Sequence, residues 1–85
     1  MKMSSNQVDA NLDFEIPKIE PGTYRHYKGK DYEVISVGLD TESLEPMVIY
    51  KPLYKSDVPF WVRPYAMFIS KIEIDGKQIS RFTKH

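Results

Sequence analysis

The sequence YRHYK, which begins at Tyr24, places two tyrosines, an arginine, a histidine and a lysine in five consecutive positions. Because side chains alternate between the two faces of a β-strand, Tyr24, His26 and Lys28 are expected on one face. Arg25 and Tyr27 then share the other, so that each face holds an aromatic ring beside a cation. Such a pair can stack on and neutralise an anionic planar ligand. The alternative interpretation is that the tyrosines favour a strand and the cations are solvated.

The sequence DTESLE, from Asp40 to Glu45, gathers carboxylates and hydroxyls in an expected loop. Glu42 and Glu45 can bind a ribose or an amino group of a ligand. The structural alternative is an ion pair from one of these two glutamates to Arg25 or Arg63. The spacing of the acidic residues matches no EF-hand pattern, so no metal site is predicted.

The sequence WVRP contains the one tryptophan of the chain, Trp61, and Arg63 two residues later. Two residues at this spacing share a face of a strand, and an indole beside a guanidinium makes a platform for a planar or anionic ligand. The alternative is a core tryptophan beside a paired arginine. The predicted ligand-binding site comprises Tyr24, Arg25, His26, Lys28, Glu42, Glu45, Trp61 and Arg63.

The residues available for catalysis are few, because the chain has two histidines and no cysteine. A serine or threonine nucleophile would need His26 as its base and a carboxylate to orient the ring, and no spacing indicates such a triad. A glycine-rich phosphate loop and an HExxH motif are also missing. We therefore expect neither an enzyme nor a cofactor. A hydrolase using His26 is the least favoured alternative.

The composition indicates one small domain, since the chain has 85 residues. Twelve basic residues balance twelve acidic ones, which disfavours a strongly basic nucleic-acid-binding protein as the default. No apolar run has the length of a membrane span, and the first residues lack the apolar region of a secretory signal. The absence of cysteine fits a reducing compartment, so a cytoplasmic location is expected.

The first 20 residues are polar and contain Pro17, with Pro21 directly after them, and they are predicted to form a flexible leader in which Phe14, Ile16 and Ile19 can dock on the domain. Residues 21–85 are predicted to form the single β domain. Strands are expected over 23–29, 32–39, from residue 47 to about Pro52, and over 61–64. The imperfect alternation of the second strand indicates either a bulge near Ser36 or Gly38 or burial on both faces.

The end of the chain gives the clearest local signal, because Asp75-Gly76 lies between two alternating runs and predicts a β-hairpin. YAMF is expected to form one helical turn, with Met67 and Phe68 in the core, and Phe82 is expected to fill the core. Short strands with turns every 8–12 residues predict a mainly-β fold of SH3-like size. It would be a small barrel or a strongly bent antiparallel sheet with at most one helical turn.

Several of these motifs, taken in order, resemble a small bacterial family known as domain of unknown function 1653. The matching stretches are GTYRHYKGKDYEV, TESLEPMVIY, WVRP, MF and the final RF, and they span roughly Pro21 to Phe82. The resemblance implies a compact, mainly-β domain without an established activity. Relatives often carry a histidine just before the TES stretch. This chain has Asp40 there, which argues against a catalytic or metal-ligating imidazole at that position.

The function expected from these observations is a binding module with an aromatic and basic face. The ligand would be a nucleotide-like small molecule or a single-stranded nucleic acid, because aromatic rings stack bases and cations meet phosphates. The alternative is a protein-interaction domain that docks a peptide or partner on an edge strand within MVIYKPLY, through Val48 and Ile49. No membrane partner is expected.

Overall fold

The computed structural model describes residues 16–85, so Phe14 and most of the predicted flexible leader lie outside the described residues. The chain forms a mainly-β fold with one short helix, as predicted. Within the described residues no helix is long and apolar enough to cross a membrane. The elements are β1 (Gly22–His26), β2 (Asp31–Leu39), β3 (Pro46–Pro52), β4 (Trp61–Pro64), α2 (Tyr65–Phe68), β5 (Lys71–Ile74), β6 (Lys77–Ser80) and β7 (Phe82–Lys84).

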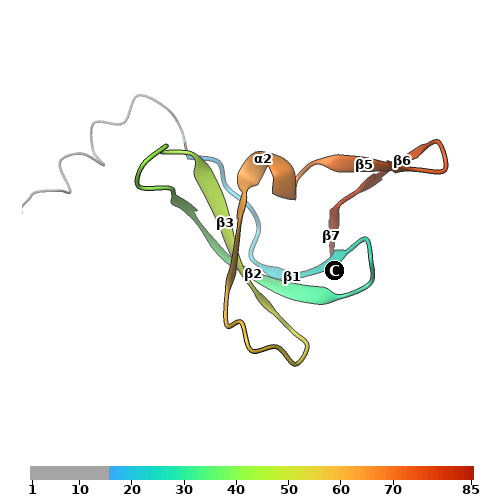
Figure 1. The fold of residues 1–85 in the computed structure, drawn as a ribbon, viewed down its shortest axis with the longest axis horizontal. Helices are drawn as coiled ribbons and strands as arrows, with labels where there is room; N and C mark the ends of the chain where they lie inside the picture. The colour runs from blue at the N-terminus through green and yellow to red at the C-terminus, as the bar shows by residue number, and fades with distance from the viewer. Residues whose placement is uncertain (1–15) are drawn as a thin grey trace, which may run out of the picture.

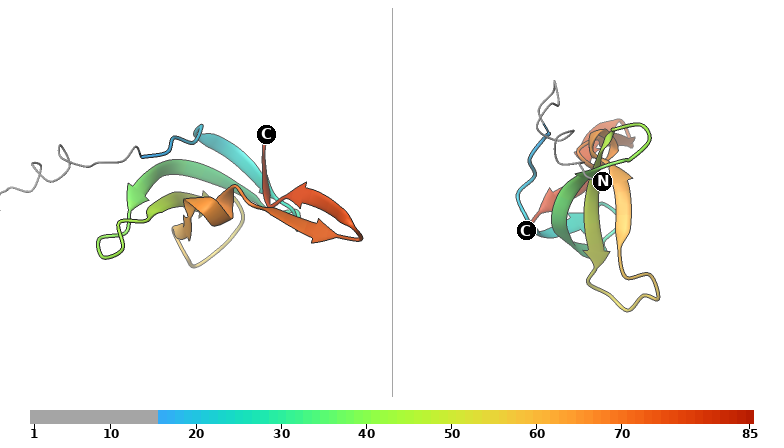
Figure 2. Two further views of the ribbon diagram at one scale, coloured as in Figure 1. Left: turned by 90° about the horizontal axis from the view of Figure 1, so that it is seen from above. Right: turned by 90° about the vertical axis from the view of Figure 1, so that its left-hand side faces the viewer.

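Five strands form one antiparallel sheet in the order β4-β3-β2-β1-β7, and β5 pairs with β6 in a separate hairpin. The sheet bends strongly but does not close into a barrel, so the bent sheet is the architecture that forms (Figures 1 and 2). β3 lies inside this sheet between β2 and β4. Its backbone is therefore already paired on both sides, and the expected edge docking through Val48 and Ile49 is wrong for this strand.

The strand register explains which side chains face the core. β1 pairs with β7 so that His26 lies opposite Phe82, and β3 pairs with β4 so that Val48 lies opposite Arg63. Directly opposite residues of an antiparallel pair project from the same face, so these four side chains all lie on the core face of the sheet. The register of β2 against β3 shifts between Val34 and Ser36, which confirms the bulge.

The core is a cluster of aromatic rings with two valines between them. The Phe68 ring stacks on the Phe82 ring with centroids 4.0 Å apart, and Phe68 is only 2% exposed. The Tyr24 and Tyr50 rings meet Phe68 edge-on at 5.6 and 5.4 Å. Edge-on and stacked contacts suit the aromatic quadrupole. The core consists of Tyr24, Val34, Val48, Tyr50, Phe68 and Phe82.

Two local predictions have different outcomes. Asp75 and Gly76 both adopt positive φ, at 53° and 79°, as the predicted hairpin turn requires. Met67, expected in the core, is 45% exposed, because the single turn of α2 directs only Phe68 fully inward. From the lead-in before β1, Ile19 packs against the core whereas Ile16 stays exposed.

Replacing Phe68 by alanine removes the ring that contacts three core aromatics, and we expect it to lower the free energy of unfolding by about 3–5 kcal/mol. Phe60→Ala is the matched control, because Phe60 is 54% exposed, and it should change stability by less than about 0.5 kcal/mol. Urea unfolding followed by circular dichroism measures both. Equal losses for the two variants would contradict this description of the core.

Candidate functional site

A pocket of about 360 Å³ opens beside the aromatic core, where the turn after β1 meets β4 and the segment before β7. We call it the cationic pocket. Four of the residues that line it carry a permanent positive charge and a fifth is a histidine, and none of the described lining residues is acidic. The lining residues are His26, Tyr27, Lys28, Lys30, Tyr32, Arg63 and Arg81.

The turn between β1 and β2 brings three of these residues together. The Gly29 N–H donates to the His26 carbonyl at 2.7 Å, and the His26 N–H donates to the Lys30 carbonyl at 2.8 Å. Gly29 has φ of 106°, a conformation that other residues adopt only with strain. The prediction of a strand over 23–29 with Tyr27 and Lys28 on opposite faces is wrong. β1 ends at His26, so Tyr27 and Lys28 belong to the turn. Both therefore line the same pocket as His26.

Arg63 is held in place by aromatic neighbours. Its Nε donates to the Tyr50 hydroxyl at 3.2 Å, and its guanidinium carbon lies 5.7 Å from the centre of the Phe82 ring. Among the described residues it forms no ion pair. A partly buried guanidinium without a carboxylate retains donors for another anion, and its planar shape suits a bidentate contact with phosphate or carboxylate.

Arg81 and Lys30 complete the positive lining. The Arg81 Nε donates to the Ser70 hydroxyl at 3.1 Å, and that hydroxyl donates to the Met67 carbonyl at 2.6 Å. The Lys30 ammonium lies 4.4 Å from the centre of the Tyr54 ring. Each cation is thus oriented by neutral groups, which leaves its charge uncompensated within the pocket.

The His26 ring is positioned by the core and by its own turn. It meets the Phe82 ring edge-on at 4.9 Å, and its Nδ1 accepts the backbone N–H of Lys28 at 3.2 Å. Nδ1 must be unprotonated to accept this bond, so the proton of the neutral ring is on Nε2. Burial lowers the pKa of His26, and the positive charges of Arg63, Lys28 and Arg81 lower it further.

The pocket also contains a tyrosine that stays protonated. The Tyr32 hydroxyl shares a hydrogen bond with the Tyr54 hydroxyl at 2.9 Å. Burial, followed by this hydrogen bond, raises the pKa of Tyr32 to about 12. The phenol therefore offers a neutral hydroxyl and the edge of a ring to the pocket.

Tyr24 and Arg25 lie apart from this pocket. Tyr24 is 8% exposed in the core, and its hydroxyl donates to the Glu20 carbonyl at 2.7 Å. Arg25 projects from the opposite face and pairs with Asp31 at 2.8 Å. The hydrogen bond from Arg25 lowers the pKa of Asp31. The carboxylate partner of Arg25 is therefore Asp31 and not Glu42 or Glu45.

The acidic loop and the tryptophan also lie outside the pocket. Asp40 organises the loop, because its carboxylate accepts the Glu42 and Ser43 N–H groups at 2.8 and 3.0 Å, and these bonds lower its pKa. Figure 1 shows this loop at the far end of β2 from the turn after β1, and the nine residues of β2 span about 26 Å at about 3.3 Å per residue. Trp61 lies opposite Tyr50 and is 40% exposed, without lining the pocket.

Of the residues predicted from the sequence, the structure brings His26, Lys28 and Arg63 together at the cationic pocket. Lys30 and Arg81 were not identified from the sequence as pocket residues. Lys30 could have been identified from the sequence KGK, because a tight turn centred on Gly29 places the residues before and after it close together. Arg81 gave no such signal, since its position depends on the path of the hairpin that precedes it.

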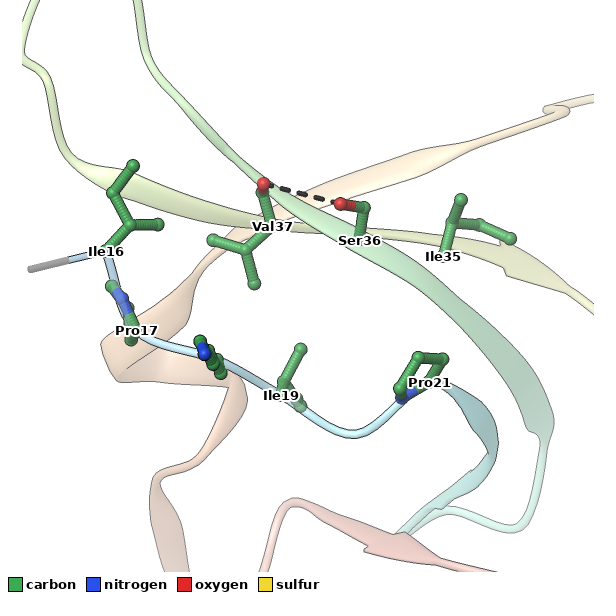
Figure 3. A pocket seen from close by; sticks show the side chains of 8 residues that line it. Ile16, Pro17, Ile19, Pro21, Ile35, Ser36 and Val37 are labelled. Carbon is green, nitrogen blue, oxygen red and sulfur yellow. Dashed lines mark hydrogen bonds between the residues drawn. The ribbon is translucent and has the colours of Figure 1, made fainter. Parts of the chain in front are cut away.

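Other hollows lack this charge pattern. Figure 3 shows one between the lead-in and β2, across which Ile19 and Val37 point toward one another. It has a volume of about 390 Å³, and Lys18 is its only charged lining residue among the described ones. A further hollow of about 520 Å³ lies beside Arg25, Ile79 and His85. Neither concentrates charge of one sign as the cationic pocket does.

The comparisons agree with the sequence resemblance. The model of a family described as a protein of unknown function (DUF1653) matches residues 22–84. The crystal structure of a DUF1653 protein from Bordetella bronchiseptica is similar, with a TM-score of 0.73 and 28% identity over 79% of this chain and 87% of that one. Among functionally curated proteins none matches the chain.

The pKa of His26 tests the geometry of the pocket. We expect it to lie below 6.5 in the free protein and to rise in Arg63→Gln, which removes a nearby positive charge. Since the folded pKa lies below the unfolded value, stability should decline as the pH falls through the unfolded value toward the folded one. NMR titration of the imidazole measures the pKa, with the His26 signal identified by its loss in His26→Gln.

The matched control for this titration is Lys51→Gln, because Lys51 pairs with Glu33 and projects from the opposite face of the sheet. It removes the same charge from the chain and should leave the His26 pKa unchanged. A normal pKa in the unmodified protein would show that the cations do not surround the imidazole as described.

Proposed function

The chain belongs to the DUF1653 family, whose description assigns no function, and we propose from the pocket geometry that it is a binding domain for a phosphorylated, nucleotide-like small molecule. The observation that carries this proposal is the group of four permanent cations and one histidine around one pocket whose described lining has no acidic residue. Charges that are removed from water are normally paired, whereas Arg63 and Arg81 are partly buried without an ion pair among the described residues. Here an anionic ligand would supply the missing negative charge.

The cations are also placed to act together. Arg63 is fixed by the Tyr50 hydroxyl and Arg81 by the Ser70 hydroxyl, so less side-chain entropy would be lost when either arginine binds an anion. Both guanidiniums retain N–H donors, which can contact two oxygens of one phosphate. Lys28 and Lys30 lie on the adjoining turn and would add attraction without a fixed geometry.

The aromatic lining supports a planar group next to the phosphate. The Tyr27 ring lies 4.5 Å from the His26 ring, at the mouth formed by the turn after β1. Tyr27 is only partly buried, so part of its ring surface is open to a base. Base stacking on an aromatic side chain is worth about 1–3 kcal/mol. The glutamates of the distant loop have no part in this proposal.

The pocket volume favours a small ligand over a nucleic-acid strand. About 360 Å³ lies within the range of small-molecule pockets. A strand several nucleotides long would need cations along a groove, whereas these cations surround one point, and the net charge of the chain is zero. Single-stranded nucleic acid is therefore an outcome to be tested against the nucleotide.

The first test is an amide NMR titration with adenosine monophosphate, with adenosine and inorganic phosphate added separately. We expect shifts at residues 26–30, Arg63 and Arg81 with the nucleotide, weaker ones with phosphate, and the weakest with adenosine. Arg63→Gln should weaken nucleotide binding about tenfold or more, because a hydrogen bond to a charged group contributes about 1.5–3 kcal/mol.

Lys51→Gln is the control and should bind the nucleotide as the unmodified protein does, since its charge lies on the opposite face. Spectra that do not change at millimolar nucleotide or phosphate would refute the proposal. Much tighter binding of an eight-residue oligothymidylate, with a steep salt dependence, would show that the ligand is single-stranded nucleic acid.

The pH dependence of anion binding gives a second test. A bound anion favours the protonated imidazole and raises the pKa of His26, so binding takes up a proton between the free and bound pKa values. Sulfate keeps its charge throughout this range. It should bind more tightly at pH 5.5 than at pH 7.5, by at most about tenfold for a one-unit rise in pKa. His26→Gln should abolish the difference, and an equal pH dependence in that variant would contradict the role of His26.

A further inference from the structure

The hairpin of β5 and β6 extends away from the five-stranded sheet. Figures 1 and 2 show it projecting beyond α2, with neither strand added to the edge of the main sheet. At its base the Arg81 N–H donates to the Ser70 carbonyl at 3.0 Å. A hairpin of two strands alone is only marginally stable in water. In this hairpin the outer edges of β5 and β6 pair with no other strand formed by residues 16–85.

The two faces of the hairpin differ in character. Ile72 lies opposite Ile79, and Ile74 lies opposite Lys77, so three isoleucines share one face. Ile74 and Ile79 are 42% and 37% exposed. The other face carries Lys71, Glu73, Gln78 and Ser80, and it is wholly polar.

The two-residue turn determines which backbone groups point outward. In such a hairpin the residues next to the turn form a hydrogen-bonded pair, and hydrogen-bonded and non-bonded pairs then alternate. Ile74 and Ile72 therefore direct their backbone groups toward β6. Lys71 and Glu73 direct theirs toward the outer edge of β5, where no strand formed by residues 16–85 pairs with them.

We infer that two copies of this chain associate by antiparallel pairing of their β5 edges, with the two-fold axis at Ile72. In this register Lys71 of each copy lies opposite Glu73 of the other, and the backbone groups of these residues form the hydrogen-bonded pairs. Ile72 lies opposite its own copy in the intervening non-bonded pair, where side chains approach most closely. The charge pairs, the backbone hydrogen bonds and the contact between the two Ile72 side chains are thus all favourable in this one register.

The self-complementary sequence is what selects a second copy as the partner. Shifting the axis to Glu73 would place two glutamates opposite one another, which is unfavourable. The Ile72 register instead forms a four-stranded sheet with six isoleucines on one face. Three or more strands with an apolar face can be stable where two cannot.

Charge reversal at β5 tests the inference, with the association measured by sedimentation velocity from micromolar to millimolar concentration. The unmodified protein should form dimers as its concentration rises. Lys71→Glu and Glu73→Lys each place two like charges opposite one another in the dimer. Each should weaken self-association roughly tenfold or more, because two symmetric cross-strand pairs change from attraction to repulsion.

Mixing the two variants tests the pairing register directly. A Lys71→Glu chain and a Glu73→Lys chain restore both opposite-charge pairs in a heterodimer, and the double variant restores them in a homodimer. Both should recover the association of the unmodified protein. These side chains are exposed, so circular dichroism should confirm that every variant is folded.

Several results would overturn the inference. An unmodified protein that stays monomeric at millimolar concentration would do so, as would a dimer that is unaffected by either single reversal. Failure of the mixture to recover association would show that the pairing register is wrong. None of these results bears on the nucleotide titration, because Lys71 and Glu73 do not line the cationic pocket.

Discussion

The stacked rings of Phe68 and Phe82 are the contact on which the rest of the structure depends. Phe82 is the first residue of β7, and Phe68 is the last residue of α2. Their stacking at 4.0 Å joins one edge of the bent sheet to the helical turn that follows the other edge. It also fixes the pocket, because Arg63 lies over the Phe82 ring and His26 meets its side. A core of few aliphatic residues thus gains both its stability and the placement of its cations from aromatic contacts.

Charge is divided between the two faces of the sheet. The exposed face pairs its cations with carboxylates, as in Arg25 with Asp31 and Lys51 with Glu33. Exposed pairs of this kind contribute little to stability, about 0–1 kcal/mol. The cationic pocket keeps its positive charges without such partners among the described residues, and burial, followed by these charges, lowers the pKa of His26. This contrast between the two faces is the observation on which the proposal of an anionic ligand rests.

The sequence predicted local structure better than it predicted the site. The Asp75-Gly76 turn, the bulge in β2 and the helical turn at YAMF all depend on neighbouring residues, and all are present. The site depends on register, which residue type alone does not give. Nothing in the letters TESLE showed that β2 would carry this loop to the far end of the sheet. The pairing of Arg25 with Asp31 was accessible in principle, because these two residues lie opposite each other in the hairpin that the Gly29 turn closes.

Arg81 connects the cationic pocket with the hairpin of β5 and β6. Its side chain lines the cationic pocket, while its backbone N–H and its Nε both donate to Ser70, at the start of the free hairpin. The base of the hairpin therefore positions one of the two guanidiniums offered to an anion. The outer edge of β5 lies on the side of the hairpin away from β6, the strand that leads into Arg81. A second strand added at that edge would order the hairpin without covering Arg81. In the inferred dimer the added strand therefore lies on the side of the hairpin away from the arginine that lines the pocket.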